Sequence, residues 1–280
     1  MNKLLQSPVR IIGVFFVFAI GLGLTHATSP SAQKKEARVT EIVRDVRLLL
    51  SQAAARPAAL NENLREGTAV RTGNDSRAEL TFIDQSLTRL GANTVFSFGR
   101  GTHTYDLGSG AILMYAPERA GEVKIRASAA TAAITGFTVM IESHPKGLNK
   151  FAILHGKGKV SFDGLRDEPC RLHEGQMIVW HAHPRTCPRV LDIDISKLLN
   201  GNLARGFKRP LPELDIILAE IKNQETEPPS GGLIDPTNQD VLDQRAAASG
   251  ASGPPGATGP TGPTGRQEPQ HREPQHPPGQ

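Results

Sequence analysis

Strict alternation in the stretch "RAELTFI", residues 77–83, constrains the fold of this chain more than any other feature. The small and apolar side chains fall on one face and the polar ones on the other, as in Ala78, Leu80 and Phe82 against Arg77, Glu79 and Thr81. This period of two is typical of a half-buried β-strand. The preceding "TGNDS" supplies residues that tolerate the positive φ of a tight hairpin, and "DQS" at 84–86 is a second turn. The stretch therefore predicts part of an antiparallel meander.

Short apolar segments of the same kind continue along the chain and predict an all-β fold, a roll or sandwich of short hairpins. The expected strands are Tyr105–Leu107, Ala111–Tyr115, Val123–Ala127, Phe137–Glu142, Lys150–Leu154, Lys157–Phe162 and Met177–His181. A glycine recurs between aliphatic residues at four places, Gly67, Gly110, Gly156 and Gly175. We expect each of these glycines to form a turn just before a strand.

Two helices are expected after the β-region, at Leu191–Leu203 and Leu211–Asn223. The second places Leu214, Ile217, Leu218 and Ile221 on one side. Such an apolar stripe is typical of a docking helix, and we expect it to pack on the β-domain rather than on a partner. Residues 191–224 are thus interpreted as a helical extension.

Composition shifts again after residue 224, and we expect residues 225–280 to be a disordered linker and tail. Residues 250–265 have glycine at every third place with proline between, which is the collagen pattern. A stretch of so few triplets is too short to form a stable triple helix by itself. We therefore expect a monomer rather than a collagen-like trimer.

The first residues have the order of a secretory signal peptide. Lys3 and Arg10 precede an uninterrupted apolar run from Ile11 to Leu24, and Ala27 closes a small-residue cleavage site. We expect residues 1–27 to be removed and the chain to be periplasmic or secreted. An uncleaved membrane anchor is the alternative, and the membrane is a partner only in that case.

The charge balance argues against nucleic acid as a partner. The formal charge is +4 over 280 residues, and Lys3 and Arg10 belong to the expected signal peptide. Lysine and arginine form no dense stripe along the chain. The "GFKRP" at 206–210 is interpreted as a solvated loop.

The chain has two cysteines, Cys170 and Cys187, both in the part expected to be exported. An even count in an oxidising compartment favours a disulfide, which would close a hairpin and stabilise it by about 3 kcal/mol. The alternative is a metal site, because Cys170, His173, His183 and Cys187 have the residue types and local spacing of a zinc centre. His181 would be a spare ligand.

The sequence contains none of the residue patterns that mark common enzymes. There is no Gly-x-Ser-x-Gly, no His-Glu-x-x-His and no phosphate-binding loop. The aspartates near turns, such as Asp84 and Asp106, are explained as turn-capping residues. We therefore expect no enzymatic activity and no cofactor.

Several segments in order resemble the FecR-type domain: "LREGTAVRTGNDSRAELTFIDQSLTRLGANT", "YDLGSGAILMYAP", "VKIRASAATAAITGFTVMIE", "FAILHGKGKVSF" and "LHEGQMIVW". The residues that match the family's motifs are Gly67, Thr72, Gly73, Ser76, Asp84, Ser86, Gly136, Gly175 and Gln176. The chain departs from the pattern at Phe137, where the family has Thr or Ser. The resemblance implies a FecR-like β-domain at residues 36–190.

The resemblance also implies a class of function. Founding members of the family carry a signal from an outer-membrane iron-siderophore transporter to a cytoplasmic sigma factor. The few residues before Ile11 are not expected to bind a sigma factor. The leading hypothesis is therefore an exported, non-enzymatic domain that contacts a protein or another envelope component. A membrane-anchored sensor in iron-uptake-type signalling and a Cys/His metal-binding protein are the alternatives.

Overall fold

The computed structural model describes residues 37–50, 53–99, 103–165, 168–181 and 183–250. The chain divides into two units, Met1–Gln33 and Lys34–Gln280, and every described residue belongs to the second. The expected signal peptide and collagen-like stretch lie outside the described residues, apart from Gly250.

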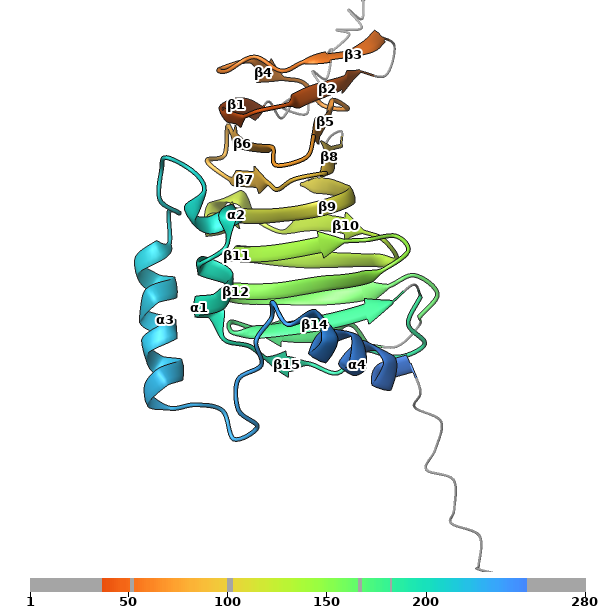
Figure 1. Ribbon diagram of the computed structural model, residues 1–280, viewed down its shortest axis with the longest axis vertical. Coiled ribbons are helices and arrows are strands. Elements are labelled where there is room, and N and C mark those ends of the chain that lie inside the picture. Colours follow the sequence, from red (N-terminus) through yellow and green to blue (C-terminus); the bar gives the residue numbers. More distant parts are fainter. Residues whose placement is uncertain (1–36, 51–52, 100–102, 166–167, 182, 251–280) are drawn as a thin grey trace, which may run out of the picture. The chain divides into compact units, whose positions relative to one another are not determined.

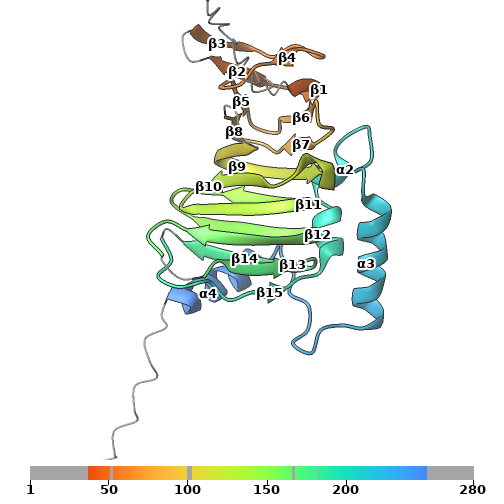
Figure 2. The ribbon, with the colours of Figure 1, turned by 180° about the vertical axis from the view of Figure 1, so that it is seen from behind.

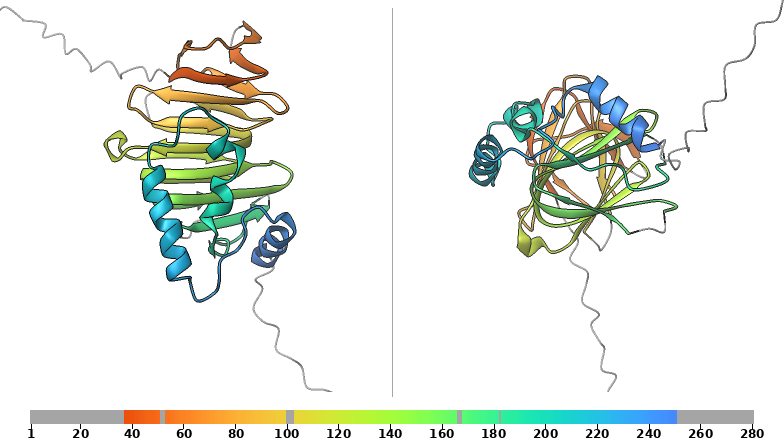
Figure 3. Two further views of the ribbon diagram at one scale, coloured as in Figure 1. Left: turned by 60° about the vertical axis from the view of Figure 1, so that its left-hand side comes forward. Right: turned by 90° about the horizontal axis from the view of Figure 1, so that it is seen from below.

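Fifteen strands form one continuous sheet that folds into two facing layers (Figure 1). Layer A has the order β4-β1-β6-β7-β9-β11-β12-β14-β15, and layer B has the order β3-β2-β5-β8-β9-β10-β11-β12-β13. All neighbours are antiparallel except β9 and β10. The end-on view in Figure 3 shows strands curving around a common interior. The predicted all-β sandwich is confirmed.

Most strands belong to a single layer. In layer A these are β1 (Ala37–Val43), β4 (Asn63–Leu64), β6 (Arg77–Phe82), β7 (Leu87–Leu90), β14 (Gln176–His181) and β15 (Leu191–Asp192). In layer B they are β2 (Val46–Leu50), β3 (Ala53–Pro57), β5 (Ala69–Thr72), β8 (Val95–Phe98), β10 (Val123–Ala127) and β13 (Cys170–His173).

Three long strands run through both layers: β9 (Thr104–Ala116), β11 (Ala130–Ser143) and β12 (Leu148–Phe162). Each changes layer at a glycine with positive φ, namely Gly110 at 89°, Gly136 at 54° and Gly156 at 92°. A side chain is not tolerated at Gly156, because its Cβ would lie 2.4 Å from the carbonyl oxygen of Gly136. The glycines therefore let the sheet turn a corner without ending a strand.

These corners correct the expected turns. Gly67 and Gly175 do precede strands, but Gly110 and Gly156 lie inside β9 and β12. The four short strands expected around them are halves of two long ones. Residues 37–43 and 46–50 are also extended, as β1 and β2.

The main core lies between the layers. Inward side chains from both layers form one cluster, for example Val39 and Leu80 from layer A and Val70, Phe96 and Ile134 from layer B. The expected inward face of β6 is confirmed, since Ala78, Leu80 and Phe82 are all buried. Burial of these side chains supplies most of the favourable free energy of folding.

A second core lies on the outer face of layer A, beneath the C-terminal segment. Leu113, Met140 and Met177 from the sheet pack there with buried residues of the helices. The helices are α1 (Ile195–Leu199), α2 (Asn202–Arg205), α3 (Leu214–Thr226) and α4 (Gln239–Gly250), with a 3₁₀ turn, η1 (Glu118–Ala120), earlier in the chain. In Figure 2, α1, α2 and α3 lie along one side of the strands, while α4 lies apart from them, near β14 and β15.

The C-terminal helices differ from the expected ones in two ways. The segment 191–203 is not one helix, because Leu191 and Asp192 pair with β14 and Gly201 separates α1 from α2. Residues 225–250 are ordered, whereas disorder was expected from residue 225. There α4 buries Leu242 and Ala246 in the second core.

The docking helix packs on its own domain, as expected. Ile217 is fully buried in α3, and Leu214 and Ile221 are partly buried beside it. Leu218 differs from the expectation, because it is 49% exposed. No helix in the described part of the chain is both long and apolar enough to cross a membrane.

Candidate functional site

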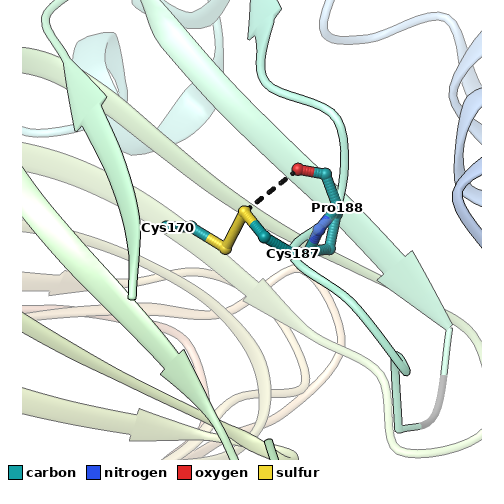
Figure 4. The surroundings of a disulfide bond; sticks show 3 residues. All are labelled: Cys170, Cys187 and Pro188. Atoms are coloured by element: carbon teal, nitrogen blue, oxygen red, sulfur yellow. Dashed lines mark hydrogen bonds between the residues drawn. A yellow bond between two sulfur atoms is a disulfide. The ribbon is translucent and has the colours of Figure 1, made fainter. Parts of the chain in front are cut away.

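Cys170 and Cys187 form a disulfide, and their Cα atoms lie 5.7 Å apart (Figure 4). The bond ties the first residue of β13 to the segment that leads from β14 to β15. Sγ of Cys187 lies 3.4 Å from the carbonyl oxygen of Pro188, a packing contact because a disulfide sulfur carries no proton. The expected pairing is thus present in the structure.

The disulfide leaves no thiolate for the alternative zinc site. His173 and His183 are exposed, and His181 forms an ion pair with Asp243 of α4 at 3.3 Å when it is protonated. Among the described residues, no three or more His, Cys, Asp or Glu side chains lie close enough to hold a metal ion. The four residues of the hypothesised centre are therefore not a zinc site in this disulfide-bonded form.

The motif residues of the resemblance hold turns and strand ends. The Thr72 hydroxyl accepts a bond from the backbone N–H of Thr94 at 2.9 Å, and the Gly73 N–H donates to Asp45 O at 2.9 Å. Oδ1 of Asp84 accepts from the N–H of Ser86 at 2.9 Å.

The Gly-Gln turn at Gly175 and Gln176 is tied in the same way. The Gly175 N–H donates to Ile153 O at 2.9 Å, and Oε1 of Gln176 accepts from the N–H of His173 at 3.0 Å. Gly136 is the exception, since it lies inside β11 rather than at a turn.

A buried ion pair fixes the C-terminal segment to layer A. Nε of Arg89 donates to Glu79 Oε2 at 3.1 Å, and both side chains are fully buried. Arg89 also donates to the carbonyl oxygens of Leu203, Ala204 and Arg209. Burial lowers the pKa of Arg89, and the hydrogen bond that Arg89 donates to Glu79 opposes that effect. A guanidinium remains charged even so.

The "GFKRP" loop contributes Phe207 and Arg209 to this cluster. The Phe207 ring lies under the Arg89 guanidinium at 4.6 Å, and Arg209 donates to Glu79 Oε1 at 2.7 Å. The interpretation of this loop as solvated is therefore wrong for Phe207, which is buried, whereas Lys208, Arg209 and Pro210 are exposed as expected. The loop's partners Glu79 and Arg89 are more than a hundred residues away in sequence, so local composition carried no signal of the contact.

Layer B presents a different outer face, one with exposed cations. A groove of about 370 Å³ crosses β11, β12 and β13, and it is lined by Glu122, Ala133, Thr135, Lys157, Gly158, Lys159, Arg171, Leu172 and His173. Lys157, Lys159, Arg171 and His173 alternate with inward residues along their strands and are all exposed. Sequence patterning placed Lys157 and Lys159 on a strand but did not single them out.

Two further hollows lie elsewhere. One of about 480 Å³ is bordered by the carboxylates of Glu174, Asp192, Glu220 and Glu227. Another, of about 450 Å³, lies beside Arg38 and Arg209. The layer B groove differs from both because its cations form a regular pattern on adjacent strands.

The part of the chain from β5 to β12, which contains the three glycine corners, matches a known protein family. Residues 68–161 match the family model described as FecR protein. The predicted resemblance is confirmed for this region, which is narrower than the 36–190 expected and less than half of the chain. The FecR-type region contributes Lys157 and Lys159 to the groove, while Arg171 and His173 follow it.

Comparison with solved structures adds little to this. Two crystal structures of a "putative anti-sigma factor" from Parabacteroides distasonis ATCC 8503 are each 14% identical, with a TM-score of 0.39 over 48% of this chain. The similar part spans 65% and 64% of those chains, less than two thirds of their length. No curated protein matches the chain.

Proposed function

We propose that this chain is an exported, non-enzymatic FecR-type module that acts in envelope signalling by contact with another protein. The difference between the outer faces of layer A and layer B supports this proposal. The C-terminal segment covers much of layer A with a second core, whereas layer B presents the charged groove. A rigid β-face of this kind suits recognition of another molecule.

Two other findings support the proposal. The FecR match at 68–161 belongs to the β-sandwich that carries both faces. The apolar run Ile11–Leu24 and Ala27 have the pattern of a signal peptide. Intact mass of the protein from bacterial envelopes tests export: a chain beginning at Thr28 is expected. A chain that keeps Met1 would instead favour the anchored sensor.

Site-specific photocrosslinking tests the contact. A photoreactive amino acid in place of Thr135, which lines the groove, is expected to give one discrete crosslinked protein in intact envelopes. The matched control is Ala219, an exposed residue of α3. Crosslinks from Ala219 alone, or from neither position, would contradict a contact face on layer B.

A further inference from the structure

The cations of the layer B groove lie in an arrangement that costs stability. Lys157 pairs directly with His173 across β12 and β13, and Lys159 pairs with Arg171. All four side chains are exposed on the same outer face. Like charges placed directly opposite on neighbouring strands destabilise a sheet. The chain tolerates such a pair at Lys159 and Arg171, and a second one at Lys157 and His173 whenever His173 is protonated.

Acidic residues nearby offset this charge only weakly. Arg171 is 3.8 Å from Glu168, and both side chains are mostly exposed. Glu122 lines the groove but lies 3.9 Å from Lys124. Within the described part of the chain, neither Lys157 nor Lys159 forms an ion pair. Exposed pairs at such distances contribute little, so the groove keeps a net positive charge.

The spacing of the cations defines what would neutralise them. Lys157 and Lys159 are two residues apart on a strand, about 6.8 Å, and adjacent strands are about 4.8 Å apart. An extended polypeptide with an acidic residue at every second position repeats its carboxylates at the same distance of about 6.8 Å. Such a segment can pair with Lys157 and Lys159 in register, and Arg171 can bind a carboxylate with two donors.

We propose that the groove binds an extended acidic segment of a partner protein, with alternate carboxylates over Lys157, Lys159 and Arg171. His173 adds a further positive charge when it is protonated. This proposal rests on the function proposed above and specifies the chemistry of the partner. Binding through exposed charges is steered by electrostatics and is weakened by salt.

Fluorescence anisotropy of the full chain with a labelled octapeptide of alternating glutamate and threonine tests the proposal. The matched peptide has glutamine in place of glutamate. We expect salt-sensitive binding of the acidic peptide and little binding of the glutamine peptide. The double variant Lys157→Gln/Lys159→Gln is expected to bind about tenfold more weakly, by the loss of two exposed ion pairs.

The control variant is Lys197→Gln/Lys222→Gln, which removes the same charge from the exposed surfaces of α1 and α3. It is expected to bind like the unchanged protein. Equal weakening by both double variants would overturn the proposal, because net charge alone would then explain binding. Binding of the sulfated polysaccharide heparin without binding of the acidic peptide would overturn it too.

The two proposals can fail separately. If Thr135 crosslinks to a protein but the acidic peptide does not bind, the contact face stands and the acidic segment is wrong. If neither crosslinking nor peptide binding occurs, both proposals are wrong.

Discussion

Arg89 and Glu79 show how a single buried charge pair can hold two distant parts of a chain together. The pair lies on the outer face of layer A, and its hydrogen bonds reach the backbone of residues 203–209. The alternation in "RAELTFI" correctly placed Glu79 on the face opposite Leu80. It could not show that this face is covered, because the covering segment is distant in sequence.

Removal of Arg89 is expected to destabilise the protein strongly. Arg89→Met leaves Glu79 buried with a weaker partner and several carbonyl groups without a donor, so the expected loss is about 3–5 kcal/mol. Arg209→Gln is the matched control. Its side chain is 58% exposed, so its loss is expected to stay below about 1 kcal/mol. Urea unfolding measures the free energy of unfolding of both variants. Equal losses of stability would contradict a special role for the buried Arg89–Glu79 pair.

The two tyrosines are expected to titrate separately. Burial, and secondarily the charge of Asp84, raises the pKa of Tyr105, while Tyr115 is raised by burial and by Glu213. Tyr105 is 1% exposed and Tyr115 is half-buried. Stability linked to Tyr105 is therefore fully present below about pH 10, the unfolded pKa, and is lost as pH rises towards the raised folded pKa.

Phenolate absorbance during an alkaline titration checks this order, since the chain has only these two tyrosines. Tyr115 is expected to ionise first, and Tyr105 only together with unfolding. Tyr105→Phe should leave a single early step. Two phenolates appearing together in the folded protein would show that Tyr105 is accessible.

At the scale of elements, the glycine corners of β9, β11 and β12 determine how the two layers connect. The sequence predicted strands on both sides of Gly110 and Gly156 but placed turns between them. A glycine with positive φ serves a turn and a strand corner equally well, so local sequence cannot distinguish the two. The distinction depends on which strands pair with each half, and those partners are distant in the sequence.

Gly156→Ala is expected to disrupt the corner severely. The added Cβ would clash with the backbone of Gly136, and the positive φ at residue 156 is unfavourable for alanine. We therefore expect the free energy of unfolding to fall by more than about 3 kcal/mol. Gly121→Ala is the control, because its φ is 73° and nothing lies within 4 Å of an added Cβ. That change should cost about 1–2 kcal/mol. Similar melting temperatures for both variants would contradict a steric corner.

Helix α4 was not predicted from the sequence. Its stretch "QDVLDQRAAASG" has a weak apolar pattern and follows a linker-like composition. Among the residues of α4 whose burial the structure describes, only Leu242 and Ala246 are buried, and they pack on a core that belongs mostly to other elements. Tertiary packing therefore stabilises this helix more than local helix propensity does.

At the scale of the whole molecule, the disulfide links layer B to the segment that returns to layer A. Its closed loop spans a sequence separation of 17, for which the chain-entropy estimate is about 3 kcal/mol. Cys170→Ala/Cys187→Ala is expected to lower the free energy of unfolding by that amount. A reductant should destabilise the unchanged protein by the same amount as the double substitution does, and it should not affect the variant. An effect of the reductant on the variant would show that the reductant acts on something other than this disulfide.

Contact of a partner protein with the outer face of layer B can be tested by lysine footprinting in intact envelopes. Acetylation of each lysine is compared between envelopes and the purified protein by mass spectrometry. Lys157 and Lys159 are expected to be protected in envelopes, while Lys197 and Lys222 react equally in both. Equal reaction of all four lysines, or protection of Lys197 and Lys222 alone, would contradict contact through layer B.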